Sequence, residues 1–320
     1  MKQTNPLNIL CAGECMVELR GESSRFTSSF AGDVINFGIY LKRLQPDASV
    51  KFFSAIGEDT ISQNLLNFLN LERIDSEYVF RTPDKTLGLY MVHTNSQGER
   101  TFNYWRSDSA AKQMFTLADT SMLNRAAMTA DYFFFSGITL AILDQHSRNQ
   151  LFTLAENMHA AGKTIVFDPN YRPTLWENTH QAKHQITCAY QLSDILLSSQ
   201  DDEQALFGTN NIDESLEHLE AFNISEIILT NGPGNISGLV DDERLNIPPV
   251  PPEKVVDTTS AGDSFNAGYL AARHAGSHAS SAVLQASALA STVIGCSGAI
   301  MPKSTKMEYK TNKRPNPLSP

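Results

Sequence analysis

Short, nearly continuous runs of hydrophobic residues alternate with amphipathic stretches along most of the chain. Runs of this length are typical of strands that are buried on both faces of a parallel sheet. They predict strands at 8–13, 51–56, 132–136, 164–168, 195–198 and 226–230. Helical periodicity predicts helices at 34–44, 60–69, 145–160, 179–192 and 215–222. This alternation predicts an α/β fold, with a mainly parallel central sheet and helices on both faces.

One region departs from that alternation. Residues 86–94 and 100–106 alternate apolar and polar side chains, and Asn95-Ser-Gln-Gly98 between them is a hairpin turn sequence. Residues 16–20 add a further strand. We expect a small β-sheet, built from about 14–32 and 86–106, that lies apart from the main sheet and serves as a lid. A hairpin with one apolar face can also pair across a dimer. A homo-oligomer joined through the lid is therefore one possible assembly of this protein.

Charge and cysteine content narrow the class of protein. The 320 residues include 25 Lys plus Arg and 35 Asp plus Glu, a formal net charge of −10. Such a surface repels phosphate backbones and anionic lipid, so neither nucleic acid nor a membrane is an expected partner. Four scattered cysteines, and an N-terminus without a signal-peptide pattern, favour a cytoplasmic protein.

The strongest chemical signal lies between Val255 and Leu270, where a short predicted strand leads into a helix of small residues. A helix start presents unpaired N–H groups and the positive end of the helix dipole. Ala261 and Gly262 carry little side chain, so a phosphate can approach their amides. Asp263, in the same turn, suits the removal of a proton from a hydroxyl that attacks the phosphate. A simple helix-capping role for Asp263 is the alternative.

The longer string Asp257-Thr-Thr-Ser-Ala-Gly-Asp-Ser-Phe265 resembles the second signature of the PfkB-type, ribokinase-like carbohydrate kinases. The resemblance implies that Asp263 is the catalytic base and that the amides before it, including those of Ala261 and Gly262, form an anion hole. Phe30-Ala-Gly-Asp-Val-Ile-Asn36 resembles the family's first signature, which grips the sugar, with Ala31 in place of a glycine. The similarity spans about residues 8–302, which implies a kinase domain at 1–302. Residues 303–320 are polar with three prolines and are expected to form a mobile tail.

Three further segments are similar to the branch of this family that acts on 2-keto-3-deoxygluconate. They are Gly13-Glu-Cys-Met-Val-Glu18, Gly98-Glu-Arg-Thr-Phe-Asn-Tyr-Trp-Arg106 and Asp168-Pro-Asn-Tyr-Arg-Pro-Thr-Leu-Trp176. A sugar acid calls for arginine, whose planar fork pairs with a carboxylate. Arg106 and Arg172 are placed at the mouth of the sheet, where α/β proteins bind ligands; surface salt bridges are their alternative role. The expected sugar contacts are Gly32, Asp33, Asn36, Tyr90, Tyr104, Arg106, Arg172 and Asp263.

The nucleotide side is marked by Thr230-Asn-Gly-Pro-Gly-Asn235, a flexible turn after a strand. Glu203 aligns with the glutamate of the family's Asn-x-x-Glu element, which is associated with hydrated Mg²⁺, although Gln200 replaces the asparagine. The resemblance puts Ser291 near the adenine. ATP and Mg²⁺ are the expected cofactors, with no metal site built from protein side chains alone. The expected nucleotide contacts are Asn170, Arg172, Ser198, Glu203, Thr230, Gly232, Gly234, Ser260, Ala261, Gly262 and Ser291.

These observations favour an ATP-dependent kinase that phosphorylates the primary hydroxyl of 2-keto-3-deoxygluconate (2-dehydro-3-deoxy-D-gluconate) to the 6-phosphate. Its partners are then the sugar acid and ATP. A kinase for a neutral sugar or a nucleoside is one alternative, and the arginines expected in the pocket argue against it. A non-catalytic sugar-binding regulator on the same fold is another, and the intact Gly262-Asp263 pair argues against that.

Overall fold

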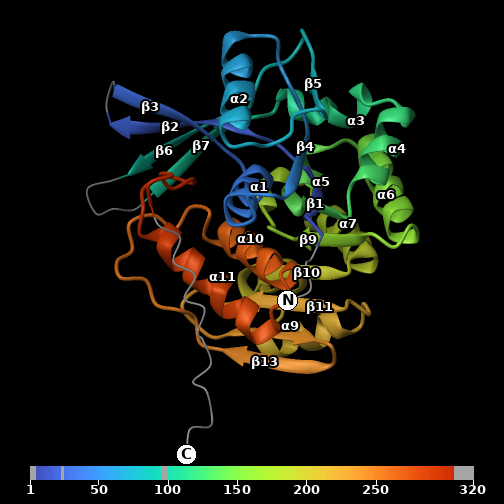
Figure 1. Ribbon diagram of the computed structural model, residues 1–320, viewed down its shortest axis with the longest axis vertical. Coiled ribbons are helices and arrows are strands. Elements are labelled where there is room, and N and C mark those ends of the chain that lie inside the picture. The colour runs from blue at the N-terminus through green and yellow to red at the C-terminus, as the bar shows by residue number, and fades with distance from the viewer. Residues whose placement is uncertain (1–4, 23–24, 95–99, 306–320) are drawn as a thin grey trace, which may run out of the picture.

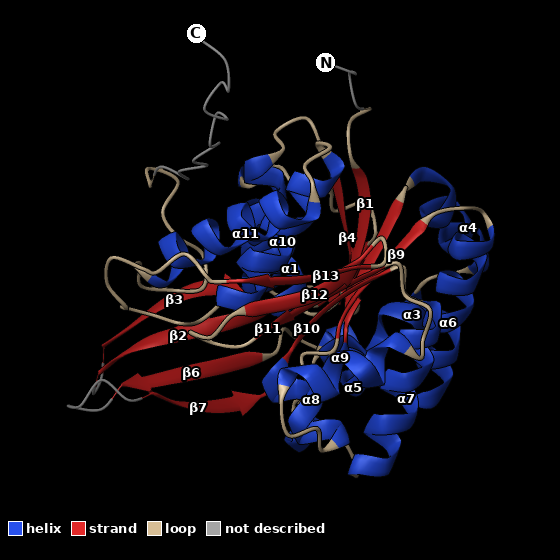
Figure 2. Cartoon of the chain, turned by 90° about the horizontal axis from the view of Figure 1, so that it is seen from below, coloured by secondary structure: helices blue, strands red, loops and turns tan. Residues whose placement is uncertain are grey.

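The computed structural model describes residues 5–22, 25–94 and 100–305, and a large β-sheet runs through its middle (Figures 1 and 2). Within these residues nine strands form this sheet, parallel except for the last two pairings at one edge. Their order across the sheet is β13 (Glu243–Ile247), β12 (Ile236–Val240), β11 (Glu226–Thr230), β10 (Ile195–Ser199), β9 (Thr164–Asp168), β8 (Tyr132–Ser136), β1 (Asn8–Ala12), β4 (Ser49–Ile56) and β5 (Val79–Arg81).

Helices cover both faces of this sheet, as Figure 2 shows. One face packs against α1 (Asp33–Leu44), α2 (Thr60–Leu71), α10 (Ala261–His274) and α11 (Ala279–Ile294). The other packs against α3 (Met114–Leu117), α4 (Thr120–Thr129), α5 (Gly137–Ile142), α6 (Gln145–Ala160), α7 (Thr179–Leu192), α8 (Gln200–Phe207) and α9 (Ile212–Glu220). The expected α/β fold is thereby confirmed.

The two cores explain why the strands read as continuous apolar runs. Along β1, Ile9 and Cys11 join the core under α1 and α10, whereas Leu10 and Ala12 join the core on the opposite face. All four are at most 1% exposed. Because successive side chains of a strand point to opposite faces, burial on both sides requires apolar residues at every position.

The lid is a separate four-stranded sheet, which extends away from the main sheet in Figure 1. Its order among the described residues is β3 (Arg25–Ala31), β2 (Met16–Glu22), β6 (Leu89–Thr94) and β7 (Arg100–Trp105), with β2 and β6 parallel. The predicted hairpin therefore exists as β6 and β7. The turn residues predicted to join them, and the tail from residue 306 onward, lie outside the described residues.

The strand predicted to precede Asp263 is wrong. Residues 248–260 form an irregular segment with no strand, and Val255 and Val256 are 65% and 41% exposed. Four of the residues 248–252 are proline, which cannot donate to a strand ladder. The amides of Val256 and Asp257 instead donate to the carbonyl of Ile294, at the end of α11.

The remaining predicted strands and helices are present with small shifts of their ends. The largest shift concerns the helix predicted at 215–222, which α9 begins at Ile212 because the Asn211 side chain caps it by accepting from the amides of Asp213 and Glu214. No helix among the described parts of the chain has both the length and the apolar content to cross a lipid bilayer.

Candidate active site

The predicted functional residues gather where the parallel strands end at their carboxyl termini. β9 ends at Asp168, and Asn266 of α10 donates to its Oδ2 at 2.9 Å. Asn170, in the loop after β9, donates from Nδ2 to Oδ2 of Asp33 in the first turn of α1, at 3.1 Å. The starts of α1 and α10 thus meet the loop after β9 at one point, the usual ligand-binding edge of an α/β sheet.

Asp263 lies at the centre of this group. Asn36 Nδ2 donates to Asp263 Oδ2 at 2.8 Å, so the two sequence signatures meet in space. Burial, followed by the nearby Asp33 carboxylate, raises the pKa of Asp263 to about 7, although the hydrogen bond from Asn36 acts in the opposite direction. A carboxylate with a pKa near the working pH is suited to general base catalysis.

Gly32 allows the close approach on which this geometry depends. It precedes α1, and its amide lies 3.3 Å from Asn36 Oδ1. A Cβ atom at Gly32 would lie 2.3 Å from the backbone oxygen of Glu14, so any other residue would push α1 away from the chain that leads into the lid. Gly32 therefore has a steric role, whatever it contributes to sugar binding.

The start of α10 provides an open cradle for an anion. Ser260 adopts the left-handed conformation (φ +64°) and makes no side-chain cap. The Ala261 amide donates to the Thr258 carbonyl at 3.3 Å. It is therefore already engaged, whereas the sequence signature predicts that it is available to an anion. A Cβ atom at Gly262 would meet nothing within 4 Å. The amides of Gly262 and Asp263 therefore begin the helix beneath open space, an arrangement that fits a phosphate group.

A second group of acids lies beside Asp263. Burial, followed by the nearby charges of Asp202 and Asp263, raises the pKa of Asp168 well above its usual range. Arg172, whose side chain is 55% exposed, lies 3.8 Å from Asp202 and also donates to the Tyr171 carbonyl. Asp168, Asp202 and Asp263 thus form an acidic group beside the half-exposed Arg172 guanidinium.

Arg106 and Arg172 come together around Tyr104. The Arg106 guanidinium carbon lies 6.0 Å from the centroid of the Tyr104 ring. Burial raises the pKa of Tyr104, and the charges of both arginines oppose that rise, so both lie near its hydroxyl. Arg106 also contacts Glu14, a pair in which both side chains are almost fully buried. Arg106 and Arg172 thus both act electrostatically on the same lid tyrosine.

The hydroxyl of Tyr90 is engaged within the lid. It donates to Glu18 Oε2 inside the lid, and the residue is only 6% exposed. Tyr104, on the neighbouring strand, is 53% exposed. In this structure Tyr104 is therefore the lid tyrosine that is free to contact a sugar, and Tyr90 supports the sheet beneath it.

Ser198 and Glu203 lie below the surface. Glu203 is fully buried, and its Oε1 accepts from Tyr190 Oη at 2.6 Å and from Ser198 Oγ at 2.8 Å. Burial raises the pKa of Glu203 to about 7. Ser198 is 5% exposed, and Thr230 donates to its carbonyl at 3.3 Å. In this structure these two side chains bond to each other at the end of β10, and their predicted contact with the nucleotide stays a prediction.

The remaining predicted nucleotide residues are spread over two segments. Gly232 has φ +51° with open space where a Cβ atom would lie, and the Gly234 amide closes the turn on the Asn231 carbonyl at 2.7 Å. Ser291 lies on α11 and donates to the carbonyl of Val250. No described contact joins Ser291 to the turn after β11.

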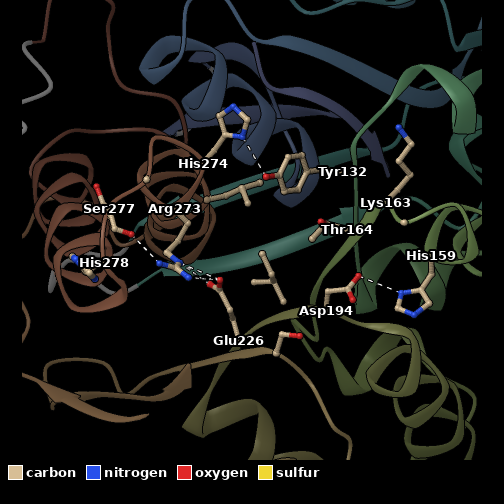
Figure 3. A pocket seen from close by; sticks show the side chains of 15 residues that line it. Tyr132, His159, Lys163, Thr164, Asp194, Glu226, Arg273, His274, Ser277 and His278 are labelled. Atoms are coloured by element: carbon tan, nitrogen blue, oxygen red, sulfur yellow. Dashed lines mark hydrogen bonds and ion pairs between the residues drawn. The ribbon is translucent and has the colours of Figure 1, made fainter. Parts of the chain in front are cut away.

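A pocket of about 610 Å³ lies at the opposite edge of the sheet, where the strands begin (Figure 3). Two pairs of its side chains contact each other. Arg273 contacts Glu226 at 2.7 Å, and His159 contacts Asp194 at 3.4 Å. None of the residues predicted for the active site lines this pocket.

The structure adds functional candidates that the sequence reasoning did not single out. Asp168 and Asn266 lie next to Asp263 in space, Asp202 lies next to Arg172, and Glu14 fixes Arg106. Asp168 and Glu14 each lie in a segment that resembles the sugar-acid branch of the family, and this resemblance could have identified them from the sequence. Asp202 and Asn266 carry no such local signal.

Comparison with known proteins agrees with this geometry. A model described as pfkB family carbohydrate kinase matches residues 7–306. The 2-dehydro-3-deoxygluconokinase of Dickeya dadantii is 37% identical over 92% of this chain and 97% of its own. Two solved structures share the fold. The PfkB protein from Polaromonas sp. JS666 has a TM-score of 0.81 at 22% identity, over 92% of this chain and 97% of that one. A putative ribokinase II from Escherichia coli, in complex with ATP and Mg²⁺, has a TM-score of 0.80 at 20% identity, over 92% and 94%.

The family model covers almost the whole chain, including both signatures that meet at Asn36 and Asp263. The chain therefore belongs to the pfkB family of carbohydrate kinases.

Proposed function

We propose that this kinase transfers the γ-phosphoryl group of ATP to the primary hydroxyl of 2-keto-3-deoxygluconate, which yields the 6-phosphate. The observation that carries the proposal is the Asp263 carboxylate, which Asn36 holds beside the open cradle of Gly262. The similarity to a relative named 2-dehydro-3-deoxygluconokinase supports the choice of sugar.

Asp263 acts as the general base. Its carboxylate takes the proton of the attacking hydroxyl, while the Asn36 amide fixes the orientation of the carboxylate. A lone pair of the sugar hydroxyl oxygen then forms the new bond to the γ-phosphorus. At the same time the bond from the γ-phosphorus to the β-phosphate oxygen breaks, and ADP leaves. The amides of Gly262 and Asp263 stabilise the negative charge on the transferred phosphoryl group. They can do so because the helix start already points these N–H groups toward the phosphate site before the reaction begins.

Three side chains give the site its preference for an acid. Arg106 and Arg172 flank Tyr104, and together they offer charged and neutral donors to the sugar carboxylate. Glu14 holds Arg106 in place from the buried side. The lid strands that carry Arg106 and Tyr104 exclude water, which would otherwise accept the phosphoryl group.

The residues present also fit ATP and Mg²⁺. The space above Gly262 admits a phosphate. Among the described residues no group of three or more His, Cys, Asp or Glu side chains is placed to hold a metal ion, so Mg²⁺ would be bound through the phosphates of ATP. ATP supplies the phosphoryl group, and Mg²⁺ neutralises charge on its phosphates. Gly262 and Asp263 would hold the phosphates by their amides, and Gly232 and Gly234 would lie along the nucleotide. We place this activity in the cytoplasm, where ATP is available.

We also propose a dimer joined through the lid. Phe26 and Trp105 share one face of the lid sheet, because their cross-strand partners Gly21 and Leu89 lie on that face, and they are 40% and 56% exposed. Pairing of two lids would bury them. Sedimentation equilibrium should find a dimer for the wild type and a monomer for Phe26→Ser/Trp105→Ser. A monomeric wild type would contradict the proposal.

An ADP-release assay over hexonates, hexoses and nucleosides tests the substrate. We expect 2-keto-3-deoxygluconate to give the highest kcat/KM, with ³¹P NMR showing phosphate on the primary hydroxyl. Asp263→Asn, purified in parallel, controls for contaminating kinases. A higher kcat/KM for a neutral sugar or a nucleoside would replace the proposed substrate, and binding without turnover would point to a regulator.

A further inference from the structure

A chain of buried charges ties the lid to the loop that precedes α10. Arg20, on lid strand β2, contacts Asp257 through Nη1 and Glu18 through Nε and Nη2, the latter at 2.6 and 3.1 Å. Glu18 and Asp257 are each 1% exposed, and the Arg20 side chain is 20% exposed. One guanidinium thus joins two buried carboxylates that belong to different parts of the fold.

On the main-domain side, Asp257 fixes the backbone on which the anion cradle stands. Its Oδ1 accepts from the Thr259 amide and its Oδ2 from the Gly298 amide, both at 2.9 Å. Burial opposes ionisation of this carboxylate, but hydrogen bonds from Thr259, Gly298 and Arg20 outweigh burial and lower the pKa of Asp257 to about 2. The carboxylate therefore remains charged across the physiological pH range.

On the lid side, three strands fix the position of Arg20. Glu18 accepts from Ser29 Oγ on β3 at 3.0 Å and from Tyr90 on β6, in addition to its bonds from Arg20 on β2. A movement of the lid therefore moves the guanidinium, and the guanidinium holds Asp257.

The loop between Asp257 and α10 is short, and at Asp257 the chain is also tied to the end of α11, because the Asp257 amide donates to the Ile294 carbonyl at 3.0 Å. It contains no strand or helix, and it enters α10 through Ser260 in the left-handed conformation. Five residues separate Asp257 from Asp263. The direction of the Gly262 and Asp263 amides therefore depends on where Asp257 is anchored.

We propose that Arg20 is a positioning residue for phosphoryl transfer, which aligns the anion cradle of Gly262 and Asp263 with the docked lid through Asp257. The proposal rests on the proposed kinase function and deepens it. Arg20 touches none of the groups assigned to the sugar carboxylate or to the proton transfer. Its loss acts on the cradle, and so on an interaction that matters most in the transition state.

The kinetic test uses Arg20→Met, which keeps most of the side-chain volume without the charge. We expect kcat to fall about 10- to 100-fold, as for one misplaced oxyanion donor, while KM for the sugar changes less than about threefold. Arg20→Lys should recover part of kcat, because an ammonium keeps the charge but lacks the fork that spans two carboxylates. A kcat within twofold of wild type for folded Arg20→Met, or a rise in KM alone, would overturn the proposal.

Arg43→Met is the matched control. Arg43 also makes a two-pronged pair with a buried acid, Glu72, at 3.0 Å for each bond, but it lies at the far end of α1. The Arg43→Met variant should be less stable than wild type, but its folded fraction should have the wild-type kcat. If both variants lose kcat equally, Arg20 is only a structural residue.

A double-variant comparison tests the route through Asp257. Asp257→Asn should lower kcat, and Arg20→Met/Asp257→Asn should be little worse than the poorer single variant, because both act on one contact. Multiplicative losses would contradict the route. Every variant is assayed on whichever sugar the wild type prefers. A different preferred sugar would then refute the substrate proposal while leaving the Arg20 test intact.

Discussion

One hydrogen bond between side chains joins the two ends of the sequence at the candidate site. Asn36 and Asp263 are 227 residues apart, and the amide-to-carboxylate distance is 2.8 Å. The bond favours the charged form of Asp263, whereas burial favours the neutral form, and the result is a pKa of about 7. The carboxylate can therefore gain and lose a proton under working conditions.

Asp263→Asn removes this ability while it keeps the shape of the side chain. The new amide oxygen can still accept the bond from Asn36, so the fold and the nucleotide affinity should change little. We expect turnover to fall by roughly 10²–10⁴-fold, the usual cost of a lost general base. Steady-state ADP release and nucleotide calorimetry measure the two effects, and more than a tenth of wild-type turnover would refute the assignment.

The wild-type pH profile gives an independent measure of the same group. Turnover should rise with pH and reach half of its plateau near pH 7, because only the ionised carboxylate accepts the proton. A profile that is flat between pH 6 and 8 would speak against Asp263 as the base.

The same pKa makes Asp263 costly for stability at neutral pH. Its folded pKa of about 7 lies above the unfolded value of about 3.9. Between these values the folded state binds a proton that the unfolded state has released, so the free energy of unfolding falls as pH rises through this range. Asparagine never ionises and avoids the loss.

We therefore expect Asp263→Asn to stabilise the protein more at pH 8 than at pH 5. The difference between the two conditions should be about 1–3 kcal/mol, less than the full shift implies because the residue is partly exposed. Urea unfolding at both pH values measures it. An equal effect at both values would show that the folded pKa is not raised.

At the scale of elements, the sequence predicts what local pattern decides. β1, β8 and β9 were predictable because burial on both faces requires unbroken apolar runs. The antiparallel strand β12 was not, since Ser237 and Gly238 interrupt its apolar pattern. α11 was not predicted either, because alanine and serine fill most of its sequence and blur the helical periodicity.

The same division holds for the site. Gly262, Asp263 and Asn36 stand in short signatures, so their proximity was expected from the sequence. The contact of Arg20 with Asp257 depends on how the lid docks on the main domain, and no local pattern encodes it. The engagement of the Tyr90 hydroxyl by Glu18 depends on which lid strands pair, and for that reason it could not be predicted from local sequence.

The lid element carries its own prediction. Arg106→Ala should raise KM for the sugar acid about 10- to 150-fold, the equivalent of 1.5–3 kcal/mol for a lost charged hydrogen bond. KM for ATP should change much less, because Arg106 lies in the group around Tyr104 rather than near the cradle. Arg106→Lys should recover only part of the loss. A larger change in KM for ATP than for the sugar would show that Arg106 acts on ATP binding, and would contradict its assignment to the sugar.

At the scale of the whole molecule, charge works against the proposed reaction. The chain has a formal net charge of −10, and both a sugar acid and ATP are anions. The field of the molecule therefore repels its own substrates at long range, and binding depends on the few cations gathered at the site. We propose this role for Arg106 and Arg172 in binding of the sugar, since the charges of both act on Tyr104.

A neutral analogue, with the sugar carboxylate reduced to an alcohol, isolates that role. Wild type should prefer the acid strongly in kcat/KM, and Arg106→Ala should lose most of the preference, since the analogue makes no charged bond. Arg106→Ala also leaves Glu14 buried without its partner, and that charge would itself repel the acid. The comparison is therefore repeated with Glu14→Gln/Arg106→Ala, in which the preference should remain small. If wild type phosphorylates the analogue as well as the acid, the natural substrate is a neutral sugar.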